Sequence, residues 1–160
     1  MKQRRTKPIR QMTPVEQSWL AGVIDGEGWI GIRKRNEIKG YYSSNIGVTN
    51  CNIPFLLNIV KITGVNRVYS KKRSNPKWRD VYRWHLDGDR VIDVLKQILP
   101  YLIIKKNQAS LAIDLQNTNK QYGELKGNKH GGTLLSQREK DFRLNIYNKI
   151  RVLNKKGVEC

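Results

Sequence analysis

Two acidic residues two positions apart, Asp25 and Glu27, are the side chains of this 160-residue chain best suited by type and spacing to do chemistry. Each is followed by a glycine, and the residues before them repeat with the period of a helix, so both acids fall at its C-terminus. A carboxylate there faces the negative end of the helix dipole, which is unfavourable unless a cation lies nearby. Carboxylates and bound waters are the ligands that suit Mg²⁺. The pair therefore indicates a candidate metal site.

The segment before these acids has the signals of a helix start. Thr13 is a candidate N-cap, Pro14 suits the first helical position, and Glu16 could complete a capping box. A helix starting there presents one face made of Trp19, Gly22, Val23 and Gly26. Two glycines inside a helix cost about 1 kcal/mol each relative to alanine, and close approach of another backbone is the best reason for them. We therefore expect this face to pack against a second helix.

Residues 20–28, LAGVIDGEG, resemble the signature motif of the LAGLIDADG homing endonucleases. The alternative is an ordinary amphipathic helix that ends in a glycine-rich turn. The resemblance covers about residues 13–118, and residues 150–154 are also similar to family C-termini. It implies that Glu27 is the catalytic acid and binds a metal, with the Gly26 carbonyl as a second ligand. Asp25 would either ligate as well or only cap the helix junction.

The chain has a single copy of this motif and no internal repeat. Family members with one motif work as homodimers, so the resemblance implies a homodimer joined through Trp19, Gly22, Val23 and Gly26. Two-fold symmetry in turn implies a palindromic or nearly palindromic DNA site.

The resemblance also assigns roles to two residues outside the motif. Asn50, at the end of the second predicted strand, would orient the attacking water, and Lys105 would polarise the phosphate; the alternative for Lys105 is one more surface lysine. Close single-motif relatives carry a further basic residue a few positions after the Asn50 equivalent, where this chain has Pro54. That helper is absent or is supplied by another residue, such as Arg79 or Lys61.

The overall charge indicates a polyanionic partner. The chain has 31 Lys and Arg against 13 Asp and Glu, a formal net charge of +18. Nucleic acid is the first candidate and an anionic membrane the second. No apolar run approaches the length of a membrane span, and no secretory signal is visible. Two cysteines and two histidines, far apart in sequence, favour neither a disulfide framework nor a zinc site. We expect an intracellular protein of the cytoplasm, the nucleoid or an organelle matrix.

The chain length suits one domain. Residues 1–12 form a basic N-terminal segment without apolar periodicity, either a disordered tail or an arm that contacts phosphates, and residues 13–160 form the domain. After the first helix, alternating patterns predict strands at 29–35, 41–50, 66–73 and 79–86, with a helix at 52–63 between the two hairpins. Further helices are expected at 88–99, 101–118 and 136–154, with a loop at 117–133. The fold class is thus α+β: an αββαββα core with a four-stranded antiparallel sheet backed by helices, plus C-terminal helices.

Side-chain patterns predict which faces are buried. On the last strand Tyr82, Trp84 and Leu86 share the core face, and in the final helix the inward positions are Phe142, Ile146, Ile150 and Leu153.

The opposite face of the sheet is predicted to bind DNA. From Trp29 to Leu86 twelve basic residues stand against two acidic ones. A β-ribbon fits the DNA major groove, where Arg, Lys, Asn and Ser read base edges. The alternative is a solvated face whose charge prevents edge pairing. The candidate DNA-binding residues are Arg33, Arg35, Tyr41, Ser43, Asn45, Thr49, Arg67, Tyr69, Lys71, Lys72, Arg73, Lys77, Arg79, Arg83 and His85.

These observations predict a site-specific DNA endonuclease that uses Mg²⁺, with Mn²⁺ as a substitute and Ca²⁺ supporting binding only. By resemblance, it would cut both strands across the minor groove and leave 3′ overhangs. A second reading is a non-catalytic binder on the same fold, either a maturase for its host intron RNA or a DNA-binding regulator. A third, a general basic RNA-binding protein, explains neither the glycine face nor the acid. Discrete double-strand cuts in duplex DNA with Mg²⁺ would separate them.

Overall fold

The computed structural model describes residues 9–71, 79–125 and 135–155, with the backbone alone for Lys71 and for 120–125. The elements, in order, are α1 (Pro14–Glu27), β1 (Gly28–Asn36), β2 (Tyr41–Asn50), α2 (Ile53–Thr63), β3 (Val68–Lys71), β4 (Val81–Asp87), α3 (Asp89–Ile98), the 3₁₀ turn η1 (Leu99–Tyr101), α4 (Lys106–Leu125) and α5 (Gln137–Leu153). The predicted α+β class and αββαββα order are confirmed. Residues 72–78, which include the expected second hairpin turn, lie outside the described residues.

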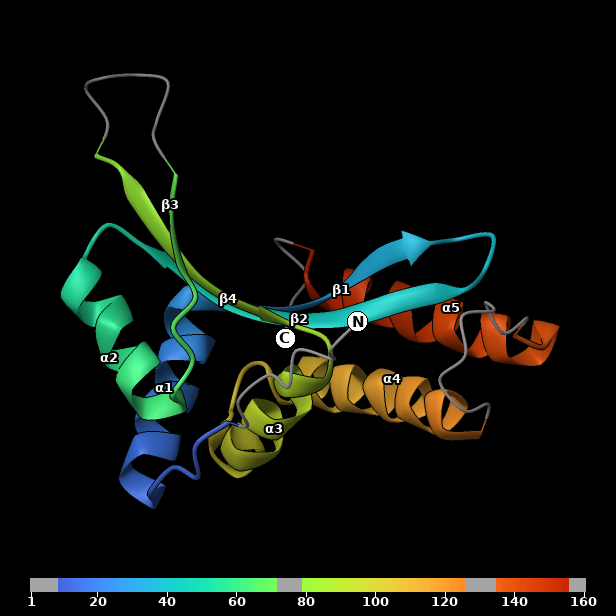
Figure 1. Ribbon diagram of the computed structural model, residues 1–160, viewed down its shortest axis with the longest axis horizontal. Helices are drawn as coiled ribbons and strands as arrows, with labels where there is room; N and C mark the ends of the chain where they lie inside the picture. Colours follow the sequence, from blue (N-terminus) through green and yellow to red (C-terminus); the bar gives the residue numbers. More distant parts are fainter. Residues whose placement is uncertain (1–8, 72–78, 126–134, 156–160) are drawn as a thin grey trace, which may run out of the picture.

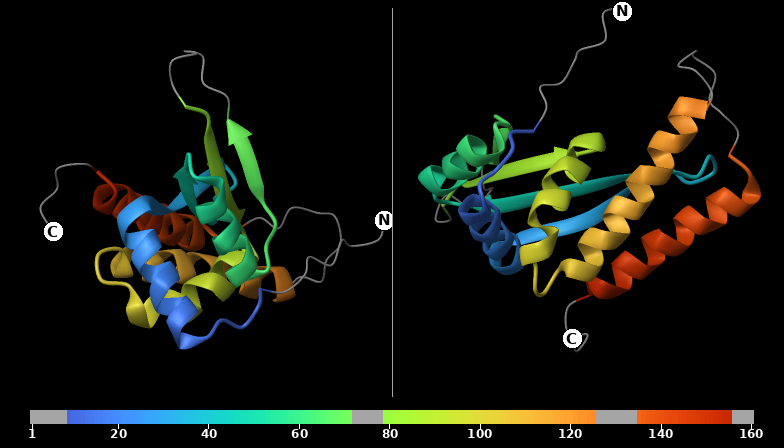
Figure 2. Two further views of the ribbon diagram at one scale, coloured as in Figure 1. Left: turned by 90° about the vertical axis from the view of Figure 1, so that its left-hand side faces the viewer. Right: turned by 90° about the horizontal axis from the view of Figure 1, so that it is seen from below.

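The four strands form one antiparallel sheet in the order β1-β2-β4-β3, so β2 and β4 are central. Figure 1 shows the strands as a curved layer with the helices gathered beneath it. The view from below in Figure 2 shows α3 and α4 crossing in front of the strands, with α1 and α2 at one end and α5 beside α4. One face of the sheet therefore packs on helices, and the other carries no described helix.

The core fills the space between the sheet and the helices. Leu20 and Ile24 of α1 are fully buried there, with Ile46 of β2, Trp84 of β4 and Leu95 of α3. Burying a side chain of this size contributes about 1.5–3 kcal/mol, so the strands are held with this face inward. The alternation predicted for β4 is confirmed at two neighbouring residues: Trp84 is buried in the core, and Arg83 is exposed on the other face.

The start of α1 is fixed by the predicted capping box, which is present. The Thr13 hydroxyl accepts from the Glu16 amide at 3.3 Å, and the Glu16 carboxylate accepts from the Thr13 amide at 2.8 Å. α2 likewise begins as expected, because the Asn52 side chain accepts from the Phe55 amide at 3.1 Å. It ends at Gly64, whose φ of 71° lies in the left-handed region that favours glycine.

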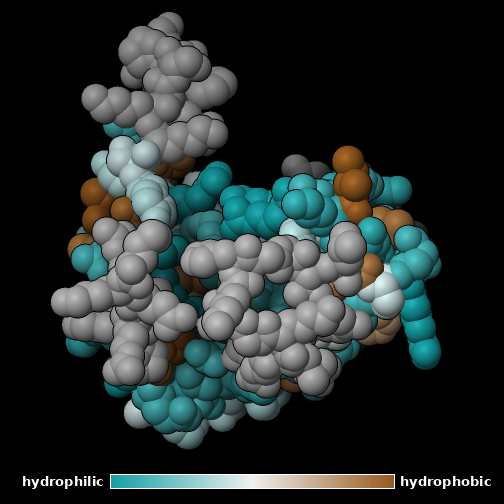
Figure 3. All heavy atoms as spheres, turned by 45° about the vertical axis from the view of Figure 1, so that its right-hand side comes forward, coloured by the Kyte–Doolittle hydropathy of each residue, from teal (hydrophilic) through white to brown (hydrophobic). Residues whose placement is uncertain are grey.

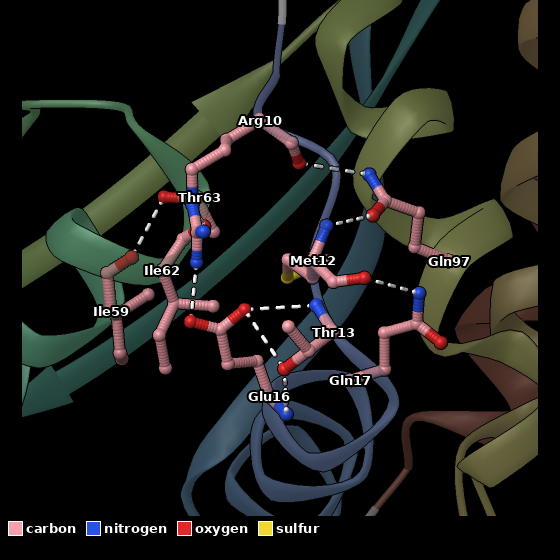
Figure 4. Close-up of polar contacts among 9 residues, drawn as sticks. All are labelled: Arg10, Met12, Thr13, Glu16, Gln17, Ile59, Ile62, Thr63 and Gln97. Carbon is pink, nitrogen blue, oxygen red and sulfur yellow. Dashed lines mark hydrogen bonds and ion pairs between the residues drawn. The ribbon is translucent and has the colours of Figure 1, made fainter.

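The last residues of the basic N-terminal segment are bound to the domain, as Figure 4 shows. Arg10 donates to the Ile62 carbonyl at 2.9 Å and pairs with the Glu16 carboxylate. The Met12 amide donates to the Gln97 side chain at 2.8 Å, and the Met12 side chain is buried. Residues 9–12 thus join α1 to α2 and α3, while residues 1–8 lie outside the described residues.

The loop predicted at 117–133 was wrong over its first part, because α4 continues to Leu125. Polar residues in this turn of helix find tertiary partners. The Asn119 amide donates to the Tyr42 carbonyl of β2 at 3.0 Å and to the Gln116 side chain at 3.3 Å. Docking on the sheet therefore outweighs the weak helical propensity of a polar run. The start of α4 also lies later than expected, at Lys106, because Tyr101 belongs to η1 and residues 102–105 are not helical.

Two of the four inward positions predicted for α5 were wrong. Ile146 and Ile150 are buried, whereas Phe142 and Leu153 are 45% and 39% exposed. Arg143 is buried in their place, and its Nε donates to Glu139 at 2.9 Å. A helix turns about 100° per residue, which puts Arg143 and Ile150 near the centre of the buried face and the two exposed residues at its margin.

Candidate functional site

Glu27 is the last residue of α1, and its side chain is exposed. Among the described residues no hydrogen bond or ion pair engages its carboxylate. Gly26 is also exposed, and a Cβ added there would meet nothing within 4 Å. The described residues contain no cluster of three or more His, Cys, Asp or Glu side chains that could hold a metal. One chain therefore offers a single open carboxylate next to the backbone of the exposed Gly26, and oxygen donors of this kind fit Mg²⁺, which keeps most of its waters.

Asp25, two residues earlier, has a different environment. Its carboxylate accepts from the amides of Ile103, Ile104 and Lys105 at 2.8, 3.2 and 2.9 Å. These amides lie immediately before α4, so Asp25 ties the end of α1 to the start of α4. Its two oxygens are used in this link. Of the two alternatives left open by the sequence, this geometry fits support of the helix junction better than metal ligation.

Lys105 lies at the same junction. Its ammonium donates to the backbone carbonyl of Asp25, at the C-terminal end of α1. Partial burial lowers the pKa of Lys105, and the negative charge of Asp25 opposes that shift. A cation here neutralises the negative end of the α1 dipole. The compensating charge that the two acids require thus comes from a residue about 80 positions further along the chain.

Asn50 ends β2 and pairs with Tyr82. Its side-chain oxygen accepts from the Asn52 amide at 2.9 Å, which fixes the orientation of the side-chain amide at the start of α2. Gly28, the residue after Glu27, pairs with Val48 of the same strand. Asn50, at the end of β2, and Glu27, just before β1, therefore lie at the same end of the sheet.

The proposed interface face of α1 is open in the single chain. Gly22 is exposed, and a Cβ added to it would meet nothing within 4 Å. Trp19 and Val23 are half-buried, and Trp19 also contacts Phe55 of α2 edge-on at 5.8 Å between ring centroids. Pairing of two chains through this face stays a prediction.

The candidate DNA-binding residues on the described strands lie on the face of the sheet opposite the core, and Arg67 and Arg79 lie just before β3 and β4. Arg33, Arg35, Tyr69, Arg79 and Arg83 are exposed; Tyr41, Ser43, Thr49, Arg67 and His85 are half-buried; Asn45 is buried. Arg35 forms an ion pair with Asp87 at 3.4 Å, so part of its charge is used within the chain. Lys71 is described by its backbone alone, and Lys72, Arg73 and Lys77 lie outside the described residues. Where Figure 3 colours the described residues, most of the visible surface is hydrophilic, with smaller hydrophobic areas.

Sequence reasoning missed Trp29 of the edge strand β1, whose indole lies over Gly47 of the central strand β2 on this face. Its indole Nε1 donates to the Asn45 side chain at 3.1 Å, and its ring stacks with His85 at 6.2 Å between centroids. Together with Arg33, Thr49 and Arg83, these three residues line a polar hollow in the sheet. The signal was available: Trp29 belongs to the same alternating set as Arg33 and Arg35, which places it on the polar face.

Several positive charges converge on this hollow. Burial lowers the pKa of His85, and the nearby charges of Arg33, Arg83 and Arg67 act in the same direction, while Asp87 opposes them. The lowered pKa favours the neutral form of His85, and the arginines supply the positive charge.

No protein-family model matches the sequence, and no curated protein matches it either. Solved structures do. The homing endonuclease I-CvuI in complex with its target is 20% identical, with a TM-score of 0.66 over 91% of this chain and 87% of that one. The archaeal intron-encoded homing endonuclease I-Vdi141I, complexed with DNA, is 17% identical, with a TM-score of 0.68 and the same coverage. The LAGLIDADG homing endonuclease I-LtrWI, bound to target DNA, is 18% identical, with a TM-score of 0.58 over 90% of this chain and 47% of that one.

The chain has the LAGLIDADG homing-endonuclease fold. The resemblance stated from residues 20–28 is thus confirmed at the level of the fold, and α1 is the helix that carries it. Identity below 25% transfers no individual residue role, so each assignment rests on the geometry of this chain. No helix among the described residues is long and apolar enough to cross a membrane.

Proposed function

We propose that this protein is a site-specific DNA endonuclease that acts as a homodimer and hydrolyses phosphodiester bonds with Mg²⁺. The observation that carries the proposal is the open Glu27 carboxylate at the end of a helix with a bare glycine face. The Lys105 ammonium is bound to the Asp25 carbonyl of the same helix end. The similar structures support DNA as the partner and a divalent metal as the cofactor: I-CvuI was solved with its target in 2 mM Ca, and with another target in 2 mM Mg, where the DNA was not cleaved.

Each group in the site has a distinct task. Glu27 and the Gly26 carbonyl would hold Mg²⁺, which supplies an activated water and charge stabilisation when bound. Lys105, held at the end of α1, places a positive charge against the phosphate. The Asn50 side-chain amide orients the attacking water. Mn²⁺ can serve in place of Mg²⁺, whereas Ca²⁺, with its looser and larger coordination sphere, would support DNA binding without cutting.

The dimer completes the site. One chain contributes one open carboxylate, and two chains that pack through Trp19, Gly22, Val23 and Gly26 would bring two such carboxylates together. The two sheets would then lie in the major groove on either side of the dimer axis, which implies a long, nearly palindromic target. An intron-encoded origin and a location in a compartment that holds genomic DNA accord with this activity.

A non-catalytic binder, either an intron RNA maturase or a DNA-binding regulator, is the second candidate. A non-catalytic binder would explain the basic sheet equally well. The open Glu27 argues against it, because an unpartnered acid facing phosphates weakens binding through like-charge repulsion and has no use without a metal.

The test is a gel-shift and a cleavage assay with Glu27→Gln on one cognate duplex, which selection from a random duplex library would supply. Loss of the charge that holds Mg²⁺ should reduce cleavage by orders of magnitude, while binding survives or tightens. Asp114→Asn removes one exposed carboxylate of α4 and serves as the control that should cut normally. Normal cutting by Glu27→Gln would refute the nuclease mechanism.

A further inference from the structure

Side chains from β1 and β4 meet above the central strand β2, at Gly47. Trp29 and His85 are the direct partners of Gly47 on the two neighbouring strands. A Cβ added to Gly47 would lie 2.3 Å from Cζ2 of Trp29, so the indole occupies the space where any other residue would place its side chain. The hydrogen bond from Nε1 to Asn45, at 3.1 Å, fixes the orientation of the ring. Trp29 therefore lies against the sheet as a fixed aromatic surface.

Arg83 of β4 is held against this surface. Its guanidinium carbon is 5.3 Å from the centroid of the Trp29 ring, within the range of a cation–π contact. Its Nε donates to the Thr49 hydroxyl at 3.3 Å. The Arg83 side chain is exposed, and among the described residues no acceptor engages its two terminal nitrogens. The inner part of the guanidinium is thus held in place, and its outer edge can donate to a ligand.

We propose that Trp29 and Thr49 hold Arg83 as a reader of guanine in the DNA target. This inference rests on the proposed function and adds a specificity-determining residue to it. The planar guanidinium matches the two major-groove acceptors of guanine, O6 and N7, better than any other base edge. Fixing the guanidinium before binding removes the entropic cost of ordering it on the DNA.

The place of Arg83 in the sheet favours a base over a phosphate. Strands lie about 4.8 Å apart, so four of them span about 14 Å, slightly more than the major-groove width of about 12 Å. Edge strands then face the sugar–phosphate walls, and the central strands face the floor. Arg83 and Thr49 belong to the central strands β4 and β2. In a homodimer, Arg83 would occur twice and read two symmetry-related guanines.

The experiment begins with selection of bound sequences from a randomised duplex library in Ca²⁺, using the full-length protein. The wild type should enrich guanine at a symmetric pair of positions, and Arg83→Ala should lose that preference while keeping the rest of the site. Arg79→Ala is the matched control, since it removes an exposed arginine that precedes β4. It should weaken binding to all sequences alike.

Replacing the selected guanines by 7-deazaguanine then tests the contact directly, because N7 becomes a CH group. A good bidentate pair discriminates by about 5- to 150-fold. The wild type should lose a substantial part of that factor on the modified duplex, and Arg83→Ala should lose none. An equal penalty for both proteins would show that Arg83 does not read the base and contacts a phosphate instead.

The positioning roles have their own readout. Thr49→Val keeps the shape of the side chain without its acceptor, and Trp29→Leu removes the ring. Both should reduce the guanine preference, whereas a purely structural role would weaken binding to every sequence equally, and that result would overturn the positioning role. If the wild type enriches a specific site but Arg83→Ala keeps every guanine preference in it, this inference alone is overturned. A wild type that enriches no sequence overturns the proposed function as well.

Discussion

Replacing Asp25 by alanine should destabilise the protein through the loss of one specific link. The Asp25 carboxylate is the acceptor for three successive amides before α4, at 2.8, 3.2 and 2.9 Å. Alanine removes all three bonds and leaves α1 and α4 without this connection. Asparagine at the same position keeps one acceptor oxygen and loses the charge.

The magnitude follows from the number and exposure of these bonds. A hydrogen bond to a charged group contributes about 1.5–3 kcal/mol, and loss of an N-cap side chain costs about 0.5–2 kcal/mol. The bonds share one acceptor, and Ile103 and Ile104 are exposed, so water can replace part of what is lost. We therefore expect Asp25→Ala to lower the free energy of unfolding by about 2–3 kcal/mol, and Asp25→Asn by about half of that.

Urea unfolding at one fixed protein concentration measures this difference. With a denaturant slope of about 1–3 kcal/mol per molar, the midpoint should fall by about 1 M or more. Asp114→Ala is the matched control, because Asp114 is an exposed acid of α4, and it should change stability by less than about 0.5 kcal/mol. An Asp25→Ala variant as stable as that control would refute the assigned link. Cleavage should also fall more in Asp25→Ala than in Asp25→Asn, because Lys105 loses its support.

Three further outcomes are expected. Gly22→Ala has open space for its Cβ, so the α1 helix should gain up to about 1 kcal/mol; sedimentation should nevertheless show weaker dimers, and a dimer of unchanged affinity would exclude Gly22 from the interface. Burial lowers the pKa of Lys105, so just below the ordinary lysine pKa the unfolded chain binds more protons than the folded one, and stability rises with pH in that window. Thermal unfolding of Lys105→Met should show a smaller rise. The same variant should lose cleavage. Binding to DNA should weaken with salt at a log–log slope of roughly −5 or steeper, and an affinity insensitive to salt would count against the sheet as the DNA-binding face.

The first helix could be predicted from the sequence because its signals are local. Thr13, Pro14 and Glu16 lie within one turn, and the cap that they form depends on no distant residue. The strands were predictable for the same reason, since alternation is visible in each strand alone. Long-range contacts account for the errors. The extension of α4 depends on the Asn119 contact with Tyr42, 77 residues away, and the sequence does not show that pairing.

The site shows the same division. Glu27 and Lys105 could be named from the motif and its resemblance, but the use of Asp25 as an acceptor for three distant amides could not. Trp29 was missed for a different reason. Its importance depends on the register that sets it opposite Gly47 and within reach of Arg83, two strands away. Periodicity predicts the face of a residue, and only the paired strands reveal its neighbours.

The junction between α1 and α4 explains how two acids can stand at the negative end of a helix. The Asp25 carboxylate accepts hydrogen bonds from three amides of another segment, and the Lys105 ammonium donates to the backbone carbonyl of Asp25. The helix end is thereby neutralised without any contact to Glu27 among the described residues. Had Lys105 paired with the Glu27 carboxylate, that carboxylate would be a poorer metal ligand, because a cation would already neutralise its charge. The division of roles between neighbouring acids, one structural and one open, is what leaves Glu27 available for the proposed Mg²⁺.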